Sequence, residues 1–187
     1  WEQNGVEAVS AVLDIPVHME LEEYEMEISL RAVDTAVFPI KIESCLSEME
    51  TGSKTVLFIT PQTLDGLTDK NQYEITKSKK EELKERILEM TAVIYSAAEE
   101  MQEPEISADE KVRGHKPAVY RETGIFAAVL ENGESRVYIP YENGKKFLES
   151  SGQTAEVKTV YIKIRGRSKA DAVKRNLKQI GFHTEPL

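Results

Sequence analysis

Hydrophobic and polar residues alternate along much of the first third of the chain. Apolar side chains at every second position over residues 15–21 and 24–30 predict two half-buried strands. The run Thr55–Ile59 is apolar almost throughout, which is typical of a strand covered on both faces. Residues 3–13 have apolar positions at helical spacing and predict a short helix. Residues 37–42 predict a third strand, placed at an edge or a bulge by a proline.

The period then changes to that of a helix. Apolar residues recur at helical spacing from Leu83 to Met101, and Ser78 with Glu81 matches the capping box that begins many helices. These features predict one long helix over about residues 78–102 that lies across a sheet. A coiled-coil seam with a partner is the alternative for the same stripe.

The second half of the chain begins after a polar segment, residues 103–117, that has the composition of a linker. Residues 118–130 and 136–141 contain alternating runs separated by Asn132-Gly133, and Asn-Gly is a strong signal for a tight hairpin turn. Asn143-Gly144 predicts another turn before a short helical piece at residues 145–150.

The C-terminal part predicts a strand and a helix. Val160, Ile162 and Ile164 alternate in the strand. The helix is expected over about residues 168–180, with Ser168 as its N-cap and Gly181 at its end. Residues 183–187 predict a short final strand.

Together these elements predict the α+β class: largely antiparallel sheet or sheets with the long helix (about 78–102) and the C-terminal helix (about 168–180) packed on the sheet. The predicted organisation is an N-terminal unit of strands plus long helix (1–102), the linker (103–117) and a C-terminal hairpin-strand-helix unit (118–187). One continuous domain is the alternative. The last 30 residues resemble, in their order of elements alone, the half-units of small ferredoxin-like modules of bacterial envelope proteins, and no function follows from that resemblance.

Composition narrows the classes of function. The net charge of −9 argues against general affinity for nucleic acid or a membrane surface, and no apolar run approaches the roughly 18 residues of a membrane span. A single cysteine, Cys45, excludes an internal disulfide and cysteine-cluster metal sites. Because the chain begins at Trp1, we expect a processed or trimmed product, which favours an extracytoplasmic location over a cytoplasmic one.

Motifs for catalysis are not recognisable in the sequence. It contains no glycine-rich phosphate loop, no dinucleotide fingerprint and no nucleophile elbow. The three histidines, His18, His115 and His183, are far apart in sequence and have no histidine partner at i+2 or i+4. We therefore predict no cofactor and no metal. Paired carboxylates of a hydrolase or transferase remain an alternative, because the chain has 33 acidic residues.

Two charged segments are candidates for binding. Glu23, Glu25 and Glu27 are expected on the outer face of one strand, as a docking face for a basic partner, as a weak divalent-cation site, or as a plain solvated edge. Residues 155–187 hold eight Lys or Arg against three acids, a balance of +5, whereas the other 154 residues total −14. The candidate anion-binding or partner-binding residues in this segment are Arg165, Arg167, Ser168, Lys169, Lys174 and Arg175.

We predict a non-enzymatic interaction domain that binds another protein or itself, as the soluble part of a membrane-anchored or exported bacterial protein. The two charged segments could be complementary, within one molecule or between copies. Binding of nucleic acid or an anionic ligand by the basic strand-helix unit, at the anion-favouring start of its helix, is the alternative. Direct membrane insertion by this segment is not expected.

Overall fold

The computed structural model describes residues 5–38, 54–96, 120–130 and 135–184. The strands in these ranges are β1 (Val6–Leu21), β2 (Tyr24–Val33), β3 (Thr55–Ile59), β4 (Thr68–Asp69), β5 (Thr91–Ser96), β6 (Arg121–Val129), β7 (Val137–Pro140) and β8 (Thr159–Ile164). The helical segments are η1 (Pro61–Gly66), α2 (Lys77–Arg86), η2 (Ile87–Glu89), α3 (Tyr141–Ser150) and α4 (Arg167–Gln179).

Six of these strands form a closed barrel. Their order around the ring is β2-β7-β3-β6-β5-β1, and the pairing of β1 with β2 closes it. The β2–β7 and β3–β6 pairs are parallel and the other pairs in the ring are antiparallel. The short β4 adds to β2, and β8 adds to β1 outside the ring. The predicted sheet with one long helix is therefore wrong, and the fold is a six-stranded barrel with two extra strands.

The barrel interior is the main hydrophobic core. Every second residue of β1 from Leu13 to Leu21 is almost fully buried, as period-two alternation in a closed sheet requires. Helix α3 adds Phe147 and Leu148 to this core, and α2 adds Leu83. Complete burial of such a side chain contributes about 1.5–3 kcal/mol. The core therefore depends on the strands and both helices together.

Strand β3 is covered on both faces, as the sequence predicts. Leu57 and Ile59 belong to the barrel core, whereas Val56 and Phe58 belong to a second, smaller cluster on the outer side. The rings of Phe38 and Tyr138 cover that outer face, with centroids 5.7 Å apart.

β1 is one continuous strand of 16 residues, and the helix predicted over residues 3–13 is wrong. Its second half pairs with β2 and β5 in the barrel, and its first half pairs with β8 alone among the strands that the structure describes. Pairing with β8, which begins only at Thr159, is a tertiary effect that outweighs the local helical spacing of the apolar residues. For the strand predicted over 37–42, Val37 and Phe38 lie in a turn and the rest lies outside the described residues.

The helix predicted over about residues 78–102 is much shorter in the structure, because its second half forms strand β5 of the barrel. Helix α2 stops at Arg86, Met90 is extended with ψ 158°, and β5 fills the place between β6 and β1. The β5 sequence TAVIYS is rich in β-branched and aromatic residues, which favour strands. The helix also begins at a different cap, since Thr76 accepts a hydrogen bond from the Lys79 backbone N–H and Ser78 lies inside the helix.

The predicted hairpin of the second half is wrong as well. Strands β6 and β7 are not neighbours, because β3 lies between them in the ring. Asn132-Gly133 lies outside the described residues, as does the predicted linker, 103–117. Strands from both sides of that linker share the barrel, and the division into two units stays a prediction.

The C-terminal strand and helix are confirmed. The N-cap of α4 is Gly166 rather than Ser168. Gly181 ends the helix with φ 92°, and the Phe182 N–H donates to the Leu177 carbonyl at 3.0 Å. His183 and Thr184 form no strand, and residues 185–187 lie outside the described residues. Asn143-Gly144 lies inside α3 instead of in a turn. Among the described residues, no helix combines the length and apolar character needed to cross a membrane.

Candidate functional site

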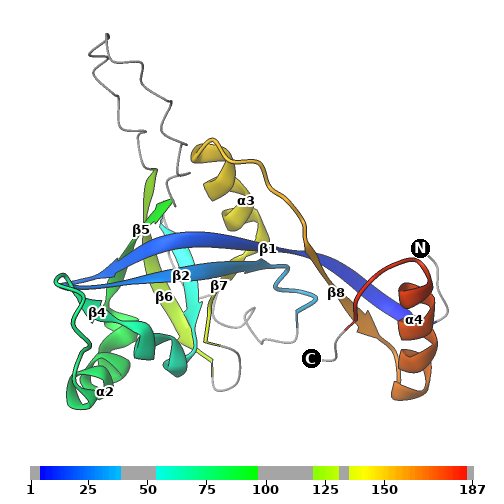
Figure 1. The fold of residues 1–187 in the computed structure, drawn as a ribbon, viewed down its shortest axis with the longest axis horizontal. Coiled ribbons are helices and arrows are strands. Elements are labelled where there is room, and N and C mark those ends of the chain that lie inside the picture. The colour runs from blue at the N-terminus through cyan, green and yellow to red at the C-terminus, as the bar shows by residue number, and fades with distance from the viewer. Residues whose placement is uncertain (1–4, 39–53, 97–119, 131–134, 185–187) are drawn as a thin grey trace, which may run out of the picture.

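The basic C-terminal segment forms part of an arm that projects from the barrel. We define the arm as residues 6–12 of β1 together with β8, α4 and the chain through Thr184. Figure 1 shows β8 and α4 at the end of the molecule that lies away from the β1–β2 turn. The base of the arm is joined to the barrel by Tyr161, whose ring lies 5.3 Å from that of Phe38. The arm is therefore a separate surface on the same molecule.

The arm leaves apolar side chains exposed. Eight large hydrophobic residues are exposed in the described part of the chain, and four of them lie on the arm: Val9, Val160, Ile180 and Phe182. A fifth, Val157, lies just before β8. Val9 and Phe182 are 53% and 54% exposed. A two-stranded ribbon with one helix can cover only part of its apolar surface. Strand β8 also ends the strand order, so within the described residues its outer edge has no partner strand.

The predicted basic residues lie around α4 instead of converging on one pocket. Arg165, Lys169, Lys174 and Arg175 are exposed. Lys174 and Lys178, four residues apart, share one helix face, whereas the aliphatic chain of Lys169 lies against Gly5 at the start of β1. Arg167 and Ser168 occupy the first turn of α4, and the positions of their side chains are not described. Within the described residues, Lys174, Arg175 and Lys178 make no ion pair with an acidic side chain.

The predicted acidic face lies at the opposite end of the molecule, where β1 turns into β2. We call Glu20, Glu22, Glu23, Glu25 and Glu27 the acidic end. Leu21 pairs with Tyr24, so the turn has two residues, and Glu22 adopts φ 54°. The Tyr24 hydroxyl donates to Glu23 Oε1 at 2.7 Å, and this bond, burial and the charge of Glu23 together raise the pKa of Tyr24 to about 12. Arg86 neutralises part of the charge, with a nitrogen 3.3 Å from Glu22.

A histidine that sequence reasoning set aside lies among these carboxylates. The β1–β2 register pairs His18 with Glu27 and Glu20 with Glu25, so all four side chains share the outer face. We call them the His18 cluster. His18 Nδ1 lies 2.8 Å from Glu27 Oε1, and His18 Nε2 lies 3.7 Å from Glu25 Oε2 and 3.9 Å from Glu20 Oε1. The signal was available, because a two-residue turn after Leu21 fixes this register.

Tyr95, from the neighbouring strand β5, borders the cluster. Its hydroxyl donates to Glu20 Oε2 at 3.1 Å, and its ring lies 5.8 Å from that of His18. Burial and the hydrogen bond to Glu20 raise the pKa of Tyr95. Three strands, β1, β2 and β5, thus hold the cluster from adjacent positions in the sheet.

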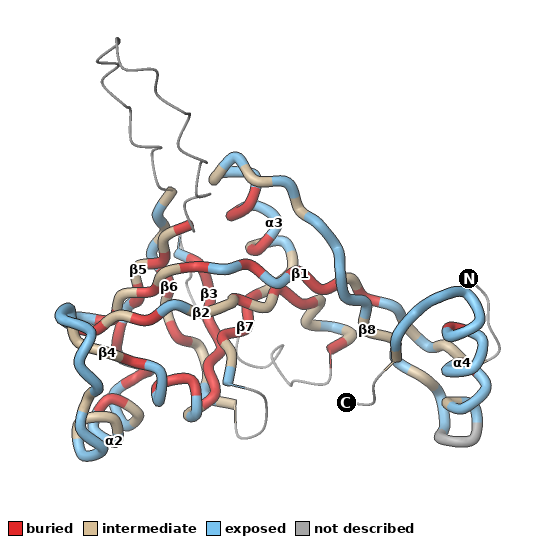
Figure 2. Tube along the Cα trace, viewed as in Figure 1, coloured by how far each residue is buried: buried red, intermediate tan, exposed pale blue. Residues whose placement is uncertain are grey.

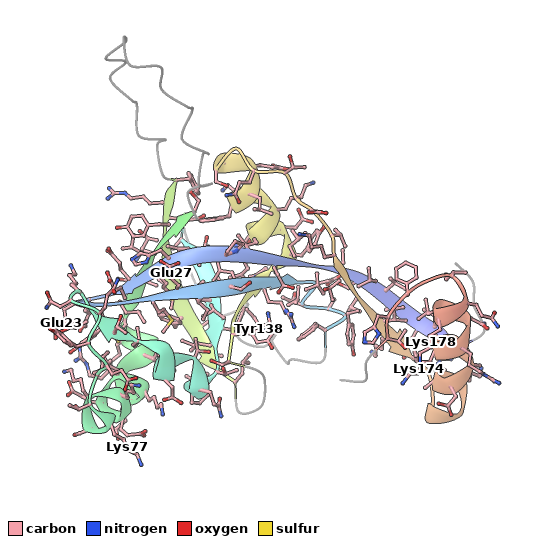
Figure 3. All side chains as sticks on the ribbon, viewed as in Figure 1. Glu23, Glu27, Lys77, Tyr138, Lys174 and Lys178 are labelled. Carbon is pink, nitrogen blue, oxygen red and sulfur yellow. The ribbon has the colours of Figure 1, made fainter. Side chains whose placement is uncertain are left out.

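The acidic end and the arm cannot meet within one molecule. Figure 3 shows Glu23 and Glu27 toward one end of the long axis, and Lys174 and Lys178 at the other. The hypothesis of complementarity within one molecule is therefore not supported by the arrangement, and complementarity between copies stays open.

An open hollow of about 420 Å³ lies beside α2, and some of its charged side chains form ion pairs. Lys84 lies 3.0 Å from Glu81 and 3.7 Å from Asp65, and Lys80 donates to the Asp65 carbonyl. Nearby, the Lys79 ammonium lowers the pKa of Glu82. A general acid works best with a raised carboxyl pKa, so this lowered pKa does not favour Glu82 in that role, and the hydrolase alternative stays a prediction.

Comparisons with known proteins give little beyond a distant likeness. No family model matches the chain, and no curated protein matches it in sequence. Among solved structures it is similar to the extracellular domain of the noncanonic ABC-type transporter YknZ from Gram-positive bacteria, with a TM-score of 0.46 and 14% sequence identity. That match covers 96% of this chain and 79% of the other. A likeness at this level carries no function to the present chain.

Proposed function

We propose that this chain is a non-enzymatic interaction domain, the soluble part of an exported or membrane-anchored bacterial protein, and that the arm is its docking surface. The observation that carries the proposal is the exposed apolar surface of the arm beside the outer edge of β8, which has no partner strand among the described residues. Exposed apolar patches rimmed by polar residues are typical of protein contacts, and an open strand edge can accept a further strand.

The occupant we propose is the acidic end of a second copy. The arm presents Lys174, Arg175 and Lys178 without acidic partners in the described residues, and the other end of the molecule presents an excess of carboxylates. Complementary charge steers two surfaces together and fixes their orientation. Since the two surfaces differ, the contact is head-to-tail, and repetition of it forms a ring or an open chain.

Sedimentation velocity over a range of protein concentrations tests this proposal. We expect association that weakens as the ionic strength rises to about 1 M, where the screening length falls to about 3 Å. Lys174→Glu combined with Lys178→Glu should abolish it. Glu23→Lys combined with Glu27→Lys should do the same from the other side. Lys145→Glu combined with Lys146→Glu, on the exposed side of α3, is the matched control and should leave association intact.

Mixing the two charge-reversed proteins gives the sharpest outcome. The reversed arm of one protein then faces the reversed end of the other, so the pair should associate although neither protein does so alone. A monomeric wild-type chain at every concentration and salt would overturn self-docking, as would a mixture that stays monomeric.

A further inference from the structure

We propose that the His18 cluster binds a divalent transition-metal ion, with Zn²⁺ as the best match, through His18 Nε2, Glu20 Oε1 and Glu25 Oε2. The inference does not depend on docking of the arm. It rests on the placement of a histidine and three carboxylates on one face of two paired strands, with the side chains held by groups around them.

The spacing of the three ligand atoms suits a single ion. They all lie within 4.8 Å of one another, and Nε2 is 3.9 Å from Glu20 Oε1 and 3.7 Å from Glu25 Oε2. Bonds of about 2.0–2.2 Å from zinc to nitrogen and oxygen place tetrahedral ligand atoms roughly 3.3–3.6 Å apart. Small side-chain rotations of the two glutamates therefore bring all three atoms to bonding distance, and no movement of the strands is needed.

The histidine already has the orientation of a metal ligand. Its Nδ1 lies 2.8 Å from Glu27 Oε1, and in the neutral imidazole the Nδ1–H donates to that carboxylate. This tautomer leaves the Nε2 lone pair facing Glu20 and Glu25. A carboxylate on the second ring nitrogen is the usual partner of a zinc-bound histidine, because it fixes the ring and raises its basicity.

Glu20 is held in a comparable way. The Tyr95 hydroxyl donates to Oε2 of this carboxylate at 3.1 Å, which leaves Oε1 as the atom nearer the histidine. Two of the three ligands are thus oriented by side chains that do not themselves reach the ion, Glu27 from β2 and Tyr95 from β5. A site on hydrogen-bonded strands is also more rigid than one on a loop.

Charge and donor type select the metal. A neutral imidazole with two ligating carboxylates carries −2, which a divalent ion balances. Arg121 on β6 lies opposite Tyr95 and is a cation at the border of this group. An imidazole nitrogen disfavours Ca²⁺ and Mg²⁺, which prefer oxygen, and suits zinc and its neighbours. The three ligands are only partly buried, with 30%, 32% and 23% of the side chains of His18, Glu20 and Glu25 exposed, so water can fill the remaining position.

The competing explanation is an ion-pair network without a metal, in which a protonated His18 bridges the carboxylates. The two explanations differ in a direct measurement. We would titrate the full chain with ZnCl₂ by isothermal calorimetry and with Co²⁺ by visible absorption. The expected result is one saturable site per chain, with cobalt bands of a nitrogen- and oxygen-coordinated ion.

Variants on the outer face define the site without disturbing the core. His18→Gln and Glu25→Gln should each weaken Zn²⁺ binding by more than the roughly 10–100-fold that follows loss of an outer partner. Glu27→Gln, at a side chain that is 79% exposed, should fall within that 10–100-fold range, because it affects the metal only through His18. His183→Gln and Glu149→Gln are the matched controls and should bind as the wild type does.

A wild-type chain that shows no saturable Zn²⁺ or Co²⁺ binding would overturn the proposal. Equal binding by wild type, His18→Gln and Glu25→Gln would overturn it as well, since the ion would then lie elsewhere. Lys174→Glu with Lys178→Glu should leave the zinc isotherm unchanged, which keeps a failure of arm docking distinct from a failure of this site. Thermal melts of each metal-free variant verify that the fold is intact.

Discussion

The barrel and the arm share one strand but differ in how completely they bury it. In the barrel half of β1, Leu13, Ile15 and Val17 are at most 1% exposed, because β2 pairs along this half, β5 pairs from Val17 onward, and α3 packs on the sheet. In the arm half of the same strand, Val9 is 53% exposed. Figure 2 shows buried residues concentrated in the barrel and mostly exposed ones around α4. Burial therefore follows from the number of covering elements, since both halves contain alternating apolar residues.

This difference implies unequal stability along the chain. Of the α4 residues whose burial is described, only Val173 and Leu177 are buried. Segments with few buried apolar contacts open locally at lower free energy than the core does. The arm should therefore open without the barrel, and this suits a surface that rearranges when a partner covers it.

The largest effect is expected for a large side chain that is fully buried on the outer side of the barrel. Phe58 is fully buried in β3 and belongs to the cluster that includes Phe38 and Tyr138. Phe58→Ala removes a ring from a site that cannot collapse fully, and it should lower the free energy of unfolding by about 3–5 kcal/mol. Urea denaturation monitored by circular dichroism measures this. Val160→Ala, on the arm, is the control and should change stability by no more than about 0.5 kcal/mol. Similar losses in both variants would contradict the comparison.

A smaller loss is expected at the contact between α3 and the barrel. A Cβ atom added at Gly144 would lie 2.4 Å from the Ala32 Cβ and 3.2 Å from Ile15 Cδ1. Gly144→Ala should therefore destabilise by about 1–3 kcal/mol, although alanine favours a helix by about 1 kcal/mol. Lys145→Ala, at the next and exposed position, should have little effect in the same denaturation experiment. A stabilised Gly144→Ala protein would show that α3 can move away from the sheet.

The arm should respond locally. Leu177→Ala removes one of the two buried α4 side chains, so amide hydrogens of α4 should exchange faster. The exchange rates of the barrel amides should stay close to those of the wild type. The overall free energy of unfolding should change by no more than about 0.5 kcal/mol. Hydrogen exchange resolved by peptide or by residue measures both regions together. Faster exchange of β1 and β2 to the same extent would show that arm and barrel unfold as one unit.

The sequence predicts individual strands better than it predicts their neighbours. The strands near Tyr24–Val33, Thr55–Ile59 and Thr159–Ile164 follow from alternation or a continuous apolar run, and the structure confirms them. Barrel closure depends on the β1–β2 and β2–β7 pairings, and the second of these joins residues more than 100 positions apart. No local pattern encodes such a pairing. The hairpin predicted around Asn132-Gly133 failed for this reason, since β3 takes the place between the two strands.

The long helix failed for a related reason. Leu83 and Ile87 are buried in helical segments, as the spacing predicts. The same spacing of apolar residues continues by coincidence into β5, where Ala92 and Ile94 are buried because alternate residues of the strand face the core. β-branched content was the local signal that separated them. For the candidate site, the charge of the C-terminal segment is readable directly, whereas the approach of Glu25 and Glu27 to His18 follows only when the two predicted strands are paired through the two residues between them.

The last effect concerns the acidic end, appears only at high pH, and is confined to the barrel. The pKa of Tyr24 is raised from 10.0 to about 12 in the folded chain by its hydrogen bond to Glu23 and by burial. Folding thus favours the protonated phenol. Its contribution to stability is complete below about pH 10, the unfolded pKa, and it is lost as the pH rises from there to about 12. Tyr24→Phe should therefore lose stability less steeply than the wild type over that interval.

The measurement is the urea midpoint of both proteins as the pH rises from about 9 to 12, a range that spans the unfolded and folded pKa values. Tyr95 also has a raised pKa, so Tyr24→Phe should keep part of the wild-type slope, and the double variant with Tyr95→Phe should flatten it further. Tyr73→Phe is the matched control, since that ring is 71% exposed, and it should follow the wild-type curve.

Hydrogen exchange of the α4 amides tests whether the effect stays within the barrel. All three tyrosines lie on the barrel side, so the α4 exchange rates, corrected for the intrinsic effect of pH, should be the same in every variant. If the Tyr24→Phe substitution changed the exchange of the α4 amides, the arm would be coupled to the acidic end through β1. The two regions would then form one cooperative unit.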